Sequence, residues 1–277
     1  MSTATITAPP VPARTSSGSG LSAPGVIRSE WIKLRSLRST IWSYAIVVIV
    51  SLGMAFLLSS TLGNSDFGPL IDSPERTLLQ AATFGTTFGV LVVAVLGVLV
   101  ISGEYTTGMA RSTFTAVPKR LGALAAKAVV LFVSTFVVGL ISSVASGALA
   151  FFVLASNGVH PEITGEVVTG VLLASLYLAA VSLFALGLGT ILRSSAGGIA
   201  AALGVLLLLP TILMVFASVT QAEWAANLIP YLLVNAGEAM ILPSADGLAL
   251  WESALTVGLW AAVPLAIGAV LLKRRDV

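Results

Sequence analysis

The sequence predicts an all-α integral membrane protein with six transmembrane helices, and two observations carry this prediction. Of the 277 residues, 57% are hydrophobic and 9% are charged, with a mean hydropathy of +1.02. Soluble domains contain about 25% charged residues. The charged residues separate six long apolar stretches, each long enough for a helix that crosses about 30 Å of hydrocarbon at about 1.5 Å per residue.

The positions of the six helices follow from the charged residues that bound each apolar stretch. We expect the spans at residues 41–62, 80–103, 125–155, 168–192, 198–219 and 252–272. Between the bounding charges, the stretches contain no Asp, Glu, Lys or Arg. Gradient-driven carriers usually place ionisable groups inside the membrane. The pattern therefore argues against a carrier of that kind, while a passive pore or a membrane scaffold stays open.

Basic residues gather on one side of the predicted bundle. They precede the first span, lie between spans two and three and between four and five, and follow the sixth, whereas Arg76 alone falls on the opposite side. Because basic residues resist translocation, both termini are predicted to be cytoplasmic. Acidic residues collect on the other side: Asp66, Asp72, Glu75, Glu162, Glu166, Glu223, Glu238 and Asp246. The basic pI therefore does not indicate a nucleic-acid partner.

Residues 1–25, rich in Ser, Thr, Ala, Pro and Gly, are predicted to form a disordered cytoplasmic tail. The next segment, 26–39, is predicted to be an amphipathic helix on the inner membrane surface. Its apolar arc consists of Ile27, Trp31, Leu34, Leu37 and Ile41. Glu30 and Arg38 lie at the margins of this arc, where Arg38 can extend to water but Glu30 needs a partner. This helix serves either as a basic membrane anchor or as a docking element.

The residue types needed for catalysis are scarce. The chain has no cysteine and one histidine, His160, and its carboxylates are not clustered, so no metal site, cofactor site or paired-acid active site is predicted. The phosphate-binding pattern GxxxxGK[ST] is also missing. We therefore expect a protein that is not an enzyme and that receives energy from a partner.

The longest charged cytoplasmic segment is GEYTTGMARSTFTAVPKR, residues 103–120. It is too short for a catalytic domain but long enough for one or two helical turns, bracketed by Gly108 and Pro118. It is the predicted docking surface for a partner. On the other side, residues 220–250 are expected to form short re-entrant or interfacial helices. Pro210 and Pro264 are expected to kink the last two spans.

Four strings in this order resemble one known family. SEWIKLRSLRSTIW resembles its amphipathic connecting helix, and GEYTTGMARSTFTAVPKR with the downstream Lys127 resembles its coupling loop. LRSSAGGIAAALGVLLLLP is similar to its short turn into the fifth span, and IPYLLVNAGEAM to its outer segment. The family is that of the membrane permease subunits of type 2 ABC exporters, in the actinobacterial style.

The resemblance implies a six-helix permease domain over residues 26–277 in the plasma membrane. Two permease subunits, as a homodimer or a heterodimer, would bind two cytoplasmic ATP-binding subunits and export an amphiphilic solute. Glu104, Tyr105, Gly108 and Arg111 would contact the ATPase or fix the coupling loop, and the connecting helix would carry Glu30, Trp31, Lys33 and Arg35. In the alternative interpretation, Tyr105 sits at headgroup depth and Arg111 touches lipid phosphate.

Overall fold

A computed structural model describes residues 23–62, 73–106, 120–244 and 247–274. Across these described ranges, every regular element is a helix, and six helices are long and apolar enough to cross a membrane. They are Arg38–Leu62, Pro74–Tyr105, Leu121–Ser156, Gly165–Leu192, Ser195–Thr220 and Leu250–Arg274. The predicted all-α class with six spans is therefore confirmed. Of the predicted tail, residues 1–25, the first 22 lie outside the described residues.

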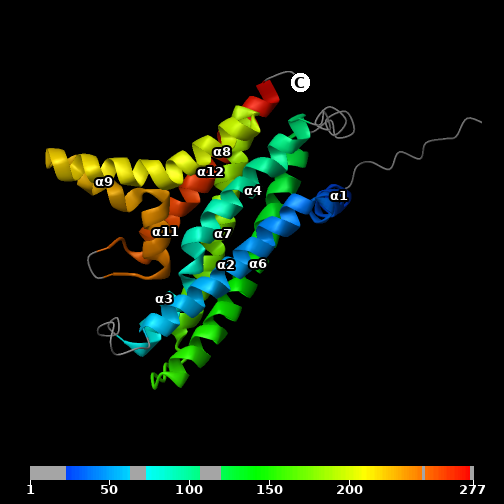
Figure 1. The fold of residues 1–277 in the computed structure, drawn as a ribbon. Coiled ribbons are helices and arrows are strands. Elements are labelled where there is room, and N and C mark those ends of the chain that lie inside the picture. Colours follow the sequence, from blue (N-terminus) through cyan, green and yellow to red (C-terminus); the bar gives the residue numbers. More distant parts are fainter. Residues whose placement is uncertain (1–22, 63–72, 107–119, 245–246, 275–277) are drawn as a thin grey trace, which may run out of the picture.

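The individual helices subdivide these spans (Figure 1). They are α1 (Ala23–Ser36), α2 (Arg38–Leu62), α3 (Pro74–Thr83), α4 (Gly85–Thr106), α6 (Arg120–Ser156), α7 (Gly165–Leu192), α8 (Ser195–Leu203), α9 (Leu209–Thr220), α10 (Glu223–Leu228), α11 (Leu233–Ile241) and α12 (Leu250–Arg274). A π-helical turn, Gly204–Leu208, joins α8 to α9, and a 3-10 turn, Ile229–Tyr231, follows α10. Helix α6 begins five residues earlier than predicted, so Lys127 lies well inside the helix rather than near its start.

Helix α7 forms the centre of the bundle and packs against α4, α6 and α12 (Figure 1). Its Tyr177 and Phe184 are fully buried, and Phe184 meets Trp260 of α12 edge to face, with ring centroids 5.8 Å apart. Gly187 lets the two helices approach closely, because a Cβ there would meet the backbone of Pro264 and Leu265. Close approach at small residues is how helices pack without a hydrophobic drive between them.

The fifth span leaves the bundle, as Figure 1 shows for α9. A π-helical turn comes directly before α9, whose second residue is Pro210, and such wider turns accompany irregularities in helices. None of the residues of α9 is buried. By contrast, Pro264 lies inside the continuous helix α12.

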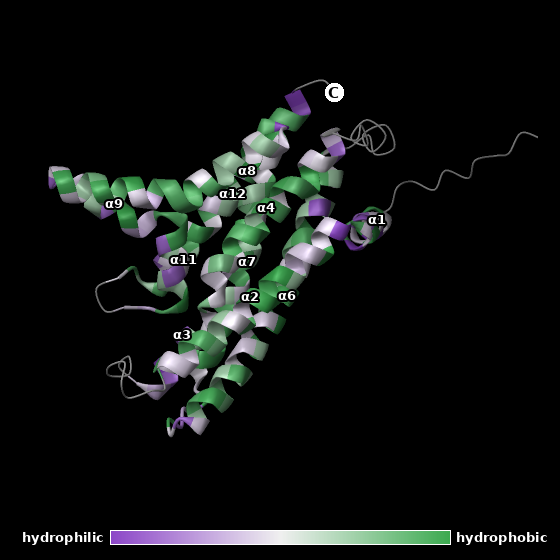
Figure 2. Ribbon diagram, in the orientation of Figure 1, coloured by the Kyte–Doolittle hydropathy of each residue, from purple (hydrophilic) through white to green (hydrophobic). Residues whose placement is uncertain are grey.

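The bundle has two ends with different charge. One end, called the basic end below, consists of α1, the last turn of α4, the first turns of α6, the turn between α7 and α8, and the end of α12. The acidic end consists of the start of α3, the connection between α6 and α7, and helices α10 and α11. Figure 2 shows hydrophilic residues on α1 and α11 and a largely hydrophobic bundle between the ends.

Candidate functional site

Two glutamates and two lysines from three helices meet at the basic end. Lys33 Nζ donates to Glu30 Oε1 at 2.7 Å and to Glu104 Oε1 at 3.1 Å. Lys127 Nζ donates to Glu30 Oε2 at 2.6 Å and to Glu104 Oε1 at 2.9 Å. Each charged group therefore contacts two groups of the opposite sign. These four side chains, Glu30, Lys33, Glu104 and Lys127, are called the charge ring below.

The charge ring is largely withdrawn from water. Glu30 is 3% exposed, Lys127 6% and Glu104 8%, while Lys33 is half-buried. Burial alone would raise the pKa of Glu30, but the charge and hydrogen bond of Lys127, with the help of Lys33, outweigh it and hold this pKa below its ordinary value. Burial alone would lower the pKa of Lys33, but Glu30 and Glu104 raise it. The pairing thus favours the ionised forms of Glu30 and Lys33.

Local sequence explains how α1 reaches the ring. Glu30 and Lys33 are three residues apart, so they share one face of α1. Leu34 follows Glu30 by one helical turn and is buried in an apolar cluster with Val100 of α4 and Leu131 of α6. The apolar contact and the charge ring together hold α1 against both helices. Glu30, for which the sequence required a partner, has two.

A second contact ties the end of α4 to the turn between α7 and α8. The guanidinium carbon of Arg193 lies 5.4 Å from the ring centroid of Tyr105, within cation–π range. Arg193 ends α7 in the left-handed conformation, with φ of 52°, and its backbone N–H donates to the carbonyl of Gly189. One turn before Tyr105, the hydroxyls of Ser102 and Ser195 lie 2.8 Å apart.

A cavity of about 330 Å³ opens beside the charge ring, between α1, α4 and α6. The four ring side chains line one part of it, and apolar side chains such as Leu99 and Val130 line another. Because the ring groups are paired with one another, none is poised as an acid, base or nucleophile. The arrangement joins three helices and offers no evident chemistry of its own.

The structure brings four of the eight predicted site residues together. Glu30, Lys33 and Glu104 lie in the charge ring, and Tyr105 stacks under Arg193 next to it. Trp31, 41% exposed, and Arg35, also exposed, lie on α1 outside the ring. Gly108 and Arg111 lie outside the described residues. The roles assigned to all eight remain predictions.

Sequence reasoning missed that Lys127 closes the ring and that Arg193 covers Tyr105. A signal for Lys127 existed, because this lysine falls within the predicted third span, 125–155, where an isolated charge requires a buried partner. Glu30 required a partner of the opposite charge. Joining these two requirements would have linked α1 to α6. Nothing in the sequence indicates the contact of Arg193 with Tyr105.

Six apolar helices and a buried charge cluster at one end define a multi-span membrane protein. The sequence profile of a family described as "ABC-2 family transporter protein" matches residues 26–203. The chain belongs to this ABC-2 transporter family. The matched region contains the whole charge ring, Tyr105 and Arg193. No curated protein matches the chain in sequence.

Proposed function

We propose that the protein is the permease subunit of an ATP-driven ABC exporter. Two such subunits, identical or different, would sit on two cytoplasmic ATP-binding subunits that hydrolyse ATP, while the permease itself catalyses no reaction. The family membership and the six apolar helices support this proposal. The basic end would face the cytoplasm of the cell, by the positive-inside rule.

The observation that carries the proposal is the position of the charge ring. Helices α4 and α6 flank the coupling loop, and the ring joins both to α1. Force applied to the loop by a closing ATPase would therefore reach three helices as one body. Rigid-body motion of helices around an interface is an established way to change the access of a transport pathway.

The ring also separates the roles of the predicted site residues. Glu104 is buried and doubly paired, and Tyr105 is covered by Arg193, so we assign both to fixing the loop rather than to contacting the ATPase. We assign ATPase contact to Gly108 and Arg111 inside the loop, and membrane contact to Trp31 and Arg35 on the exposed side of α1. The loop sequence resembles that of actinobacterial permeases.

The surface of α9 supports a second permease subunit. This helix exposes large apolar side chains and buries none: Ile212, Met214, Val215, Phe216 and Val219. In the membrane, these apolar side chains can pack against lipid or against a partner permease. An amphiphilic cargo fits the uncharged faces of the spans, because a polar solute would need polar groups along its path.

The test uses the chain purified with the ATP-binding subunit that copurifies from its native membrane. In proteoliposomes, we expect ATP-dependent uptake of an amphiphilic dye and permease-stimulated ATP hydrolysis. Glu104→Lys should reduce the stimulation by about tenfold or more, since it places three positive charges against one carboxylate. The exchange Glu104→Lys with Lys127→Glu should restore part of it, and Lys273→Met at the exposed end of α12 should change nothing.

Two outcomes would refute the proposal. One is gradient-driven uphill transport by the permease alone, which would make it a secondary carrier. The other is an unchanged coupling of hydrolysis to transport in Glu104→Lys. Without any copurifying ATPase, downhill passage of the dye through the permease would favour a passive pore, and no passage would favour a scaffold.

A further inference from the structure

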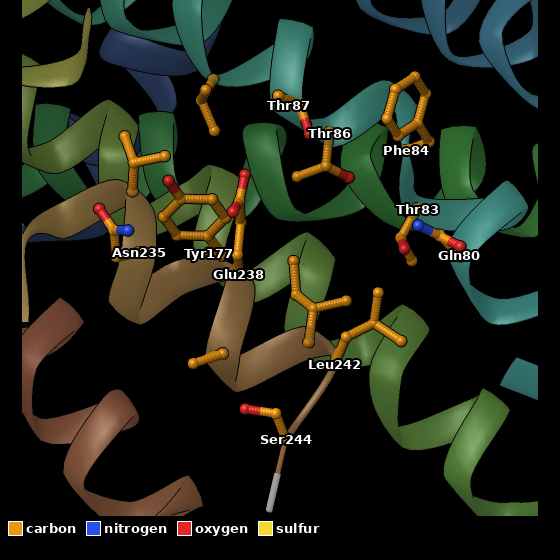
Figure 3. A pocket seen from close by; sticks show the side chains of 14 residues that line it. Gln80, Thr83, Phe84, Thr86, Thr87, Tyr177, Asn235, Glu238, Leu242 and Ser244 are labelled. Carbon is orange, nitrogen blue, oxygen red and sulfur yellow. The ribbon is translucent and has the colours of Figure 1, made fainter. Parts of the chain in front are cut away.

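A second cavity, of about 440 Å³, lies toward the acidic end and is separate from the charge ring. It is enclosed by α3, the start of α4, α7 and α11 (Figure 3). Its wall is mixed: Phe84, Val90 and Leu242 contribute apolar surface, and several amide, hydroxyl and carboxyl groups contribute polar surface. Its size is in the range of ligand pockets.

Three buried oxygen atoms on the wall of this cavity lack a hydrogen-bond partner among the described residues. They belong to Gln80 Oε1, the hydroxyl of Tyr177 and Asn235 Oδ1. Tyr177 itself is only 2% exposed. A buried polar atom left without a partner is destabilising, so such groups in a native protein call for an explanation. Three around one cavity indicate that something else supplies the donors.

A carboxylate completes the set. Glu238 lines the cavity with part of its side chain open to solvent and part buried, and that side chain forms no ion pair or hydrogen bond within the described part of the chain. In Figure 3, Tyr177 lies between Asn235 and Glu238, and its hydroxyl and the carboxylate point to the same side. The nearby Arg76 is already engaged, because it donates to Glu166 at 3.3 Å and to the carbonyl of Pro243 at 2.9 Å.

The backbone of α11 keeps these groups together. Gly237 lies directly against the ring of Tyr177, and a Cβ at this position would overlap that ring. The missing side chain therefore allows α11 to place Asn235 and Glu238 on either side of Tyr177. The described lining contains one acidic group, several acceptors and no basic side chain.

We propose that this cavity binds a primary ammonium group attached to a compact apolar group. An ammonium carries three donors and one positive charge, which match the acceptor oxygens and the single carboxylate. The rings of Phe84 and Tyr177 and the aliphatic wall would hold the apolar part. An alcohol of the same shape carries no charge to pair with Glu238, and a carboxylate carries a negative charge that Glu238 would repel.

Binding of such a cation depends on pH through Glu238. Partial burial raises the pKa of this carboxyl, so it becomes protonated at a higher pH than an ordinary glutamate. The polar groups that line the same cavity are the phenol of Tyr177 on α7, the amide of Asn235 on α11, and the neutral side chains of Gln80 and three threonines on α3 and α4. Affinity should therefore fall as the pH falls through the raised pKa.

The test measures binding to the full chain in lipid nanodiscs by isothermal titration, with empty nanodiscs as the blank. The probes are phenethylamine, 2-phenylethanol and 3-phenylpropionate. Only phenethylamine should bind, and Glu238→Gln should weaken it by about tenfold or more, since it removes the one opposite charge. Tyr177→Phe should weaken it by about two- to tenfold without altering the fold. The matched control is Glu162→Gln, an exposed acidic residue at the same end outside the cavity.

Three results would overturn the proposal: equal binding of 2-phenylethanol, unchanged phenethylamine affinity in Glu238→Gln, or the same loss in Glu162→Gln as in Glu238→Gln. Lack of phenethylamine binding by the unmodified chain would overturn it as well. The measurement needs no ATP-binding subunit. Its outcome is therefore independent of the proposed exporter function.

Discussion

At the scale of single residues, the charge ring is stable only as a complete set. Lys127 and Glu104 are buried, and each has two partners across the ring. Removing one partner of a buried pair strands the other charge in a medium that solvates it poorly. Replacing a lysine of the ring is thus costlier than replacing an exposed lysine elsewhere.

We predict that Lys127→Met lowers the free energy of unfolding by about 3–5 kcal/mol, because Glu30 and Glu104 then share a single lysine. Unfolding in mixed detergent micelles measures this loss. Lys273→Met, at an exposed position, should change it by less than about 0.5 kcal/mol. In the double variant with Glu30→Gln, part of the loss should return, and strict additivity would contradict the existence of a ring.

At the scale of elements, the sequence predicted the spans well because length and hydropathy alone decide which segments enter a membrane. It placed the start of α6 five residues too late, close to Lys127, whose ammonium group is paired with Glu30 inside the bundle. The charge ring joins residues 71 and 97 positions apart in the chain. Which residues pair over that distance depends on how the helices pack against one another. The hydrophobic periodicity of the sequence does not reveal this packing.

The contact between α7 and α12 gives a prediction at the same scale. Gly187→Ala should lower the free energy of unfolding by about 1–3 kcal/mol, because its methyl group would meet the backbone of Pro264 and Leu265. Gly258→Ala, on α12, is the matched control, since no atom lies within 4 Å of the added Cβ. It should be neutral or slightly stabilising. Equal losses in both variants would refute this account of the packing.

At the scale of the whole molecule, the separation of charge between the two ends predicts a topology. The chain contains no cysteine, so single cysteines can be introduced without removing any. We expect Asn157→Cys, exposed at the acidic end, to react with a membrane-impermeant maleimide on intact cells. Ser29→Cys, exposed on α1 at the basic end, should react only after the cells are opened. The reverse pattern would place the basic end outside.

The charge ring also limits how α1 can move. To separate α1 from α4 and α6, the hydrogen bonds from Lys33 to Glu104 and from Lys127 to Glu30 would both have to break, and each of the four charged groups would lose one of its two partners to water. Intermediate separations provide neither the partner nor the water, so gradual sliding is disfavoured. Detachment of α1 would therefore occur as an all-or-none event, accompanied by the entry of water at the inner surface of the bilayer.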